Sequence, residues 1–196
     1  MRSCWLAFML VAGFLFSPTV AGAHDDVLPS DIFTAIMLKA LNYDRNIDRQ
    51  AHEKVVIGIV YVDDDPTGHA LAEEISANIS LVKTTFKIKE KPVAGKVLGL
   101  GRIFGRQGFE RWLTRNNISV LVVAVKDPAF SPDIFNVSAA MGINSVCYSA
   151  ACIKQGAGLG IILKDNKPRM LINARSAKHE GSDYSGKFLA LCEVLP

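Results

Sequence analysis

The sequence predicts a single three-layer α/β domain, with a mostly parallel sheet flanked by helices and a β-hairpin near the C-terminus. Residues 55–62 and 118–125 are almost uninterrupted apolar and β-branched runs, which is typical of strands buried on both faces. Segments with helical periodicity alternate with these runs, as in parallel sheets. Asp165 and Asn166 separate two further apolar segments and favour a tight hairpin turn.

The N-terminal residues predict export. Arg2 precedes an apolar run over residues 5–16, and Ala21 and Ala23 form the small-residue pattern that signal peptidase cuts. The run is shorter than the roughly 20 residues that a membrane-spanning helix needs. We therefore expect cleavage near Ala23 and a mature domain over residues 24–196 that works outside the cytoplasm. An uncleaved membrane anchor is the alternative.

Composition and charge argue against some classes of function. The formal net charge is +3, and removal of Arg2 with the signal peptide lowers it to +2. No dense stripe of lysine and arginine occurs, so we expect no nucleic-acid partner. No serine or cysteine stands in a recognisable nucleophile motif with a histidine. We therefore expect a non-enzymatic protein without a cofactor.

The first half of the mature chain supplies two helices and two strands. Ser30 is the expected N-cap of a helix with a wide apolar face, which ends near Tyr43. The strand over residues 55–62 comes next and stops at an acidic turn. A helix over residues 67–79 follows, and the alternating residues 83–88 predict a more exposed strand.

The middle of the chain predicts a loop and a second strand–helix–strand unit. Residues 95–108 are glycine-rich and predict a loop. A short helix carrying residues 109–113 leads into the strand over residues 118–125. Another short helix within residues 131–142 precedes a short strand over residues 145–148.

The C-terminal third predicts the hairpin and two closing helices. The hairpin strands cover residues 158–163 and 169–172. Pro168 cannot donate a hydrogen bond to a strand ladder, so we expect the second hairpin strand at an edge of the sheet. Helices over residues 174–180 and 185–194 then close the domain.

An acidic cluster marks one candidate binding site. Asp63, Asp64 and Asp65 follow the first buried strand, and Asp127 follows the strand over residues 118–125. Ligands in open α/β sheets bind beyond the carboxyl ends of the strands, and carboxylates there could hold a divalent cation. The alternative is an ordinary Asp-Pro turn with solvated charges.

Two arginines mark a second candidate site. Arg102 and Arg106 lie in the glycine-rich loop, where they could contact an anion or a partner. The glycines of this loop do not form a dinucleotide-binding fingerprint, because they do not closely follow an apolar strand.

The cysteines are consistent with export. Cys147, Cys152 and Cys192 remain in the mature chain, and an oxidising compartment favours one disulfide among them. We expect a Cys147–Cys152 bond across a short link and a buried Cys192, although spacing alone does not fix the pairing. Three buried free thiols are the alternative.

A polar stretch follows the first helix. Asp44 and Arg45 lie within it, directly after Tyr43. We expect these two residues to pair or to cap the helix, because side chains near helix ends commonly do so.

Several segments together resemble the YfiR family of periplasmic proteins. They are the glycine-led residues 156–163, residues 167–173, the helical residues 188–192, and residues 39–46 of the first helix. The likeness spans about residues 30–196. It implies a bacterial periplasmic domain without enzymatic activity.

The resemblance also implies a partner. Well-understood relatives bind the periplasmic part of an inner-membrane diguanylate cyclase and hold it inactive, which lowers cyclic-di-GMP output. The expected partner is therefore the periplasmic domain of a membrane sensor or cyclase, and the sequence leaves a homodimer open. Repressor-type relatives have two disulfides, whereas this chain offers one cysteine pair and a third cysteine.

Two other functions remain open from the sequence. The first is a periplasmic lobe that binds a small solute near Asp63–Asp65 and the loop at residues 126–131. The second is a metal-handling protein that binds copper through His24, although no other histidine shows ligand spacing.

Overall fold

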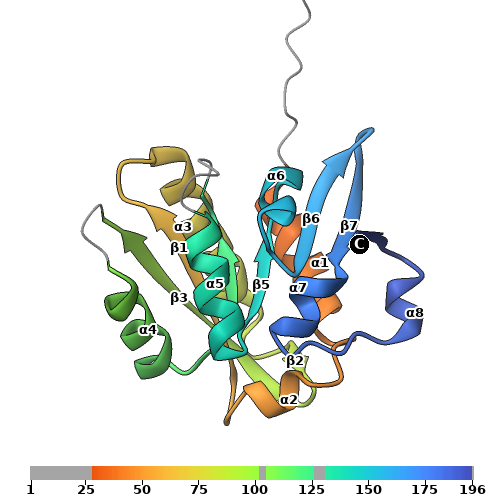
Figure 1. Ribbon diagram of the computed structural model, residues 1–196. Helices are drawn as coiled ribbons and strands as arrows, with labels where there is room; N and C mark the ends of the chain where they lie inside the picture. The colour runs from red at the N-terminus through yellow and green to blue at the C-terminus, as the bar shows by residue number, and fades with distance from the viewer. Residues whose placement is uncertain (1–27, 102–104, 126–130, 196) are drawn as a thin grey trace, which may run out of the picture.

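The computed structural model describes residues 28–101, 105–125 and 131–195 (Figure 1). The predicted signal peptide, Arg102 and Asp127 lie outside these ranges. The helices are α1 (Ser30–Leu41), α2 (Ile47–Gln50), α3 (Pro66–Val82), α4 (Arg106–Arg115), α5 (Ser131–Met141), α6 (Ala150–Lys154), α7 (Ala174–His179) and α8 (Gly186–Leu189). The strands are β1 (Val55–Val62), β2 (Lys87–Ile88), β3 (Lys91–Leu100), β4 (Ile118–Val123), β5 (Asn144–Cys147), β6 (Leu159–Lys164), β7 (Lys167–Asn173) and β8 (Glu193–Leu195).

The described strands form one sheet in the order β2-β3-β1-β4-β5-β6-β7-β8. The pairs from β3 through β1, β4 and β5 to β6 are parallel, as is β7 with β8. The β2–β3 and β6–β7 pairs are antiparallel. The predicted mostly parallel sheet with a C-terminal hairpin is therefore confirmed. Because β1 lies between β3 and β4, the strand order reverses there, which makes this point the topological switch of the sheet.

Helices cover both faces of the sheet (Figure 1), and β1 shows why the layers form. Ile57 and Ile59 point into the core under α1 and α3, whereas Val56 and Val60 point into the core under α4 and α5. Successive side chains of a strand alternate between its faces, so a strand between two helical layers must be apolar throughout. No helix in the described ranges has the length and apolar character needed to cross a bilayer.

Two predictions in the first half are wrong. Only Lys87 and Ile88 of the expected strand over residues 83–88 are extended, because α3 continues to Val82. Much of the expected glycine-rich loop belongs to the strand β3. Its glycines have a packing reason, because a Cβ on Gly95 would touch α3 and a Cβ on Gly99 would collide with the Asp63 carboxylate.

The β6–β7 hairpin is confirmed, with one difference in its position. Asp165 and Asn166 have φ values of 53° and 55°, as a type I′ turn requires. The strand β7 is not at the edge of the sheet, because β8 lies outside it. However, β8 pairs only with residues 171–173, so Pro168 has no neighbour on that side. The physical reason for the prediction therefore still applies.

The end of the chain also differs from its prediction. The helix expected over residues 185–194 ends at Leu189, and residues 193–195 form β8 instead. The outer side of β7 has backbone N–H and C=O groups that β6 does not pair. Residues 193–195 form hydrogen bonds with them. Ser30 is likewise the first residue of α1 and not its N-cap, which is Pro29.

Candidate functional site

The carboxyl edge of the sheet at the switch point carries the predicted acidic cluster. Asp65 caps α3, because its Oδ1 accepts a hydrogen bond from the Thr67 backbone N–H at 3.1 Å. The Asp63 carboxylate lies against Gly99 at the end of β3. Asp64 is exposed. The structure therefore places the cluster where the sequence predicts it, but gives two of its members local structural roles.

Aromatic side chains lie beside this cluster. The Tyr61 ring stacks on His69 with 4.6 Å between ring centroids. Burial raises the pKa of Tyr148 to about 12, with a smaller contribution from the charge of Asp65. The buried Asp65 Oδ2 has no hydrogen-bond partner among the described residues. The described part of the chain holds no group of acidic, histidine or cysteine side chains that could bind a metal ion.

The second predicted site is only half described. Arg106 is the first residue of α4, where its Nε donates to Glu110 Oε1 at 2.7 Å. Its side chain is exposed and already paired with an acid. Contact of Arg102 and Arg106 with an anion or a partner stays a prediction.

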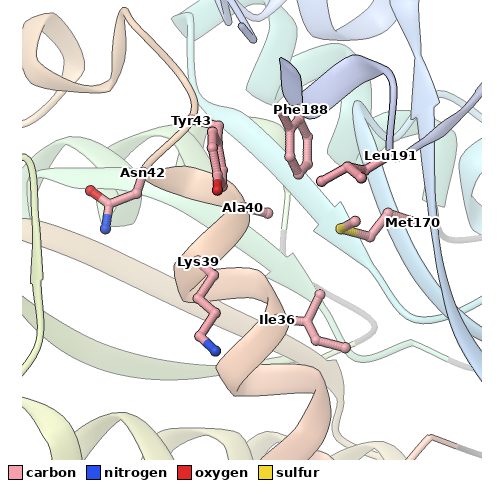
Figure 2. Close-up of a pocket in the computed structure, with 8 residues that line it drawn as sticks. All are labelled: Ile36, Lys39, Ala40, Asn42, Tyr43, Met170, Phe188 and Leu191. Carbon is pink, nitrogen blue, oxygen red and sulfur yellow. The ribbon is translucent and has the colours of Figure 1, made fainter. Parts of the chain in front are cut away.

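A cavity of about 410 Å³ opens between α1, β7 and α8 (Figure 2). The Tyr43 and Phe188 rings form one wall and stack with 5.3 Å between their centroids. Met170 and Leu191 form a second wall (Figure 2). The lining residues are Ile36, Lys39, Ala40, Asn42, Tyr43, Met170, Phe188 and Leu191. We call this cavity the α1–α8 groove. Its mostly apolar lining and its volume are those of a small-molecule site.

The polar side chains of the groove differ in whether their hydrogen-bonding groups are already used within the protein. Asn42 donates through Nδ2 to the Lys87 carbonyl at 3.2 Å and accepts from the Lys89 N–H at 2.9 Å. Its amide is therefore committed to holding β2 against α1. The Lys39 side chain is exposed and makes no ion pair or side-chain hydrogen bond with the described residues. Among the described lining residues, the Lys39 ammonium and the Tyr43 hydroxyl thus remain available to a ligand.

The sequence does not predict this groove. The wide apolar face expected of the first helix includes Ile32 and Ile36, but α1 buries only part of that face. Ile32 is 41% exposed, and Ile36 is half-buried and lines the groove. The width of the apolar face is the one signal in the sequence, because a helix packed on one side needs a narrower stripe.

Two buried carboxylates fasten the C-terminal segment beside the groove. Asp44 Oδ1 accepts from the backbone N–H groups of Asn46 and Asp183, and its Oδ2 accepts from Asn144 Nδ2 at 2.7 Å. Arg45 pairs with Asp183 at 2.9 Å. The two residues do have structural roles, but the prediction that they pair or cap the first helix is wrong, because both side chains bind the distant C-terminal segment.

Glu180 is the second buried carboxylate. It accepts hydrogen bonds from the backbone N–H and the hydroxyl of Ser145, and from the Ser138 hydroxyl at 3.5 Å. The Ser145 hydroxyl in turn accepts from the Gly158 N–H at 2.9 Å. Burial raises the pKa of Glu180 to about 8, and these hydrogen bonds only partly oppose that rise. Glu180 thereby joins the end of α7 to β5 and α5.

The three cysteines in the described residues are free thiols in the structure. Cys147 at the end of β5 and Cys152 in α6 are both buried and adjacent. Burial raises the pKa of Cys147 well above its ordinary value, and a hydrogen bond with Cys152 adds to this rise. Cys192 is half-buried and lies outside any helix, contrary to its prediction, and burial raises its pKa to about 11. The Cys147–Cys152 disulfide stays a prediction.

Comparison with solved structures defines the class of fold. A conserved domain protein from Vibrio cholerae matches with a TM-score of 0.59 and 11% identity, over 85% of this chain and 60% of that one. The ABC domain in complex with L-Trp from Streptococcus pneumonia matches with a TM-score of 0.53 and 10% identity, over 80% of this chain and 60% of that one.

A ligand-free, open substrate-binding protein with adhesive properties from Clostridium difficile matches similarly. Its TM-score is 0.53 at 10% identity, over 76% of this chain and 57% of that one. The chain thus spans about 60% of the length of these structures. Its fold resembles the lobes of ABC-type substrate-binding proteins.

No family model matches the sequence, and no curated protein matches it significantly. The resemblance to the YfiR family therefore gains no support from the comparisons, whereas the lobe-like fold agrees with the solute-binding alternative.

Proposed function

We propose that the mature chain is a non-enzymatic binding domain outside the cytoplasm that takes a small molecule in the α1–α8 groove. The groove carries the proposal, because a built cavity of about 410 Å³ with stacked aromatic and aliphatic walls suits a compact apolar ligand. The likeness of the fold to substrate-binding lobes and the predicted signal peptide support the same function.

The proposed site is the α1–α8 groove and not the acidic cluster. The solute-binding alternative placed its pocket near Asp63–Asp65, where Asp65 caps a helix and Asp63 packs against Gly99. The groove instead offers apolar surface whose burial by a ligand is favourable, at roughly 25 cal/mol for each Å² removed from water.

A thermal-shift screen of the processed protein against small molecules with an apolar body tests the proposal. A ligand that binds only the folded state raises its stability. Hits are then measured by calorimetry on two variants. Leu191→Gln replaces a groove residue whose side chain is 65% exposed, so we expect the fold to persist and the affinity to fall about tenfold.

The matched control is Leu81→Gln. Leu81 lies on α3, is 77% exposed and does not line the groove, so this variant should bind like the wild type. Equal affinities of the two variants for every hit, or a screen without hits, would overturn the proposed site.

A second candidate function is docking on a membrane partner, such as the periplasmic domain of a sensor or a diguanylate cyclase. Leu191 and Val194 favour it, because they place exposed apolar side chains on one short segment near the groove. Crosslinking from position 194 in intact cells distinguishes the two functions. Docking predicts a specific adduct with a membrane protein, and solute binding predicts none.

A further inference from the structure

Among the described residues that line the α1–α8 groove, one has a charged side chain, and that charge is positive. Lys39 lies on the exposed side of α1, one turn after Ile36 and one turn before Tyr43 (Figure 2). The other lining side chains are apolar, apart from the Tyr43 hydroxyl and Asn42, whose amide is already hydrogen-bonded to Lys87 and Lys89. A ligand in the groove therefore meets one cation and one neutral hydroxyl beside an apolar surface.

The acidic groups near the groove do not neutralise this cation. Asp31, the only acid within α1, lies eight residues before Lys39, about 12 Å along the helix. Of the acids in the adjoining segments, Asp183, Glu193 and Glu90 pair with other cations, as Asp183–Arg45, Glu193–Lys164 and Glu90–Lys87. Asp44 and Glu180 are buried and hydrogen-bonded to neutral groups. Among the described residues, the ammonium of Lys39 thus has its hydrogen-bond donors left for a ligand.

Helix electrostatics alone do not account for Lys39. The residue lies in the last turn of α1, where a cation is favoured by about 0.3–1 kcal/mol. That interaction uses none of the three N–H donors of the ammonium group. The flexible four-carbon stem also lets the ammonium move along the rim of the groove.

We propose that the groove is selective for organic anions with an apolar body, such as carboxylates bearing an aliphatic chain or an aromatic ring. The apolar body lies between the stacked Tyr43 and Phe188 rings and the Met170–Leu191 wall, and Lys39 binds the acid group at the rim. This inference rests on the proposed function of the groove and names its ligand class.

Three probes of equal chain length test the inference. Octanoate, octan-1-ol and octylamine share an apolar tail and differ in the charge of the head group. Calorimetry on the processed protein should show octanoate binding at least fivefold more tightly than octan-1-ol, and octylamine binding more weakly than both. High salt should reduce the preference for octanoate, because the Lys39 ammonium is exposed.

Variants then assign the preference to its residue. Lys39→Gln should weaken octanoate binding about fivefold and leave octan-1-ol binding within twofold. Lys83→Gln, at the exposed C-cap of α3, removes an equal charge outside the groove and should change neither. Equal losses of octanoate affinity in the two variants would mean that only the overall charge of the protein matters, and would overturn the role of Lys39.

The outcomes distinguish failure of the anion selectivity from failure of the groove as a binding site. Equal binding of octanoate and octan-1-ol, with both weakened by Leu191→Gln, keeps the groove as a binding site but overturns its selectivity for anions. Absence of binding by all three probes also overturns the anion inference. The groove itself is rejected only if the wider screen yields no ligand that depends on Leu191.

Discussion

The centre of the sheet and its C-terminal end differ in how much polar contacts contribute to their packing. The strands β1 and β4 contribute almost only apolar side chains, which helices cover on both faces. The C-terminal segment from α7 to β8 also buries Phe188 in the core, but the buried carboxyl groups of Asp44 and Glu180 join it to distant parts of the chain through hydrogen bonds. The α1–α8 groove lies between α1, β7 and this segment.

This difference indicates which part of the molecule can change its conformation without unfolding. Apolar burial is non-directional and tolerates small shifts, whereas a buried carboxylate needs each of its donors in place. The segment that carries Phe188 and Leu191 therefore depends on a few polar contacts in addition to the burial of Phe188. A change in those contacts would reshape the groove before it disturbs the centre of the sheet.

The largest expected effect is in the apolar centre. Leu121 of β4 has no exposed surface, and Leu121→Ala should lower the free energy of unfolding by about 3–5 kcal/mol, because it removes apolar contacts and leaves a cavity. Leu191→Ala, at the exposed end, should change it by less than about 0.5 kcal/mol. Urea unfolding measures both. Similar values for the two variants would remove the distinction between the regions.

The apolar centre is also the part of the fold that sequence alone could predict. Each of β1 and β4 appears as a nearly continuous apolar run, because burial on both faces favours apolar residues at almost every position, Ser119 being a polar exception. The turn at Asp165 and Asn166 is local chemistry and was likewise predictable. In contrast, β3 was not predicted, because its glycines resemble a loop signal in the sequence. They pack against α3 and Asp63, and only the folded structure brings these groups near.

The C-terminal end and the groove could not be read from local patterns. The strand β8 forms because β7 offers an open edge, and pairing with it outweighs the helical spacing of residues 185–194. The groove needs α1 to meet Leu191, about 150 residues later in the chain. The acidic cluster was placed correctly, since strand ends are predictable, but Asp65 was not predicted to cap α3.

An intermediate effect is expected at Asp44. Asp44→Ala removes the acceptor of two backbone N–H groups and of the Asn144 amide, and each donor left unpaired in the interior costs about 1–3 kcal/mol. We expect a total loss of about 2–3 kcal/mol in urea unfolding, because part of the site can take up water.

The isosteric variant Asp44→Asn is the control. Its Oδ1 still accepts from Asn46 and Asp183, and the Asn144 Oδ1, which has no partner among the described residues, can accept from the new amide after a flip. Asp44→Asn should therefore lose less than half as much stability as Asp44→Ala. Equal losses would show that the negative charge, and not the hydrogen bonds, fastens this segment.

The smallest expected effect, taken over one pH unit, is a dependence of stability on pH that belongs to the C-terminal end. Burial raises the pKa of Glu180 from 4.5 to about 8, so the folded protein keeps a proton that the unfolded chain releases near pH 4.5. The contribution of Glu180 is therefore fully favourable below pH 4.5 and is lost as the pH rises through about 8. Linkage then predicts a loss of about 1 kcal/mol between pH 6 and pH 7.

Glu180→Gln tests this dependence, because the amide keeps the shape and the hydrogen-bonding capacity of the protonated acid without titrating. Urea unfolding from pH 5 to pH 8 should show a falling stability for the wild type and a flatter profile for the variant. Glu74→Gln, on an exposed turn of α3, should keep the slope of the wild type. If the Glu180→Gln profile keeps that slope as well, then Ser145 and Ser138 stabilise the carboxylate enough to keep it ionised in the folded protein, and the C-terminal end is held by charge-assisted hydrogen bonds.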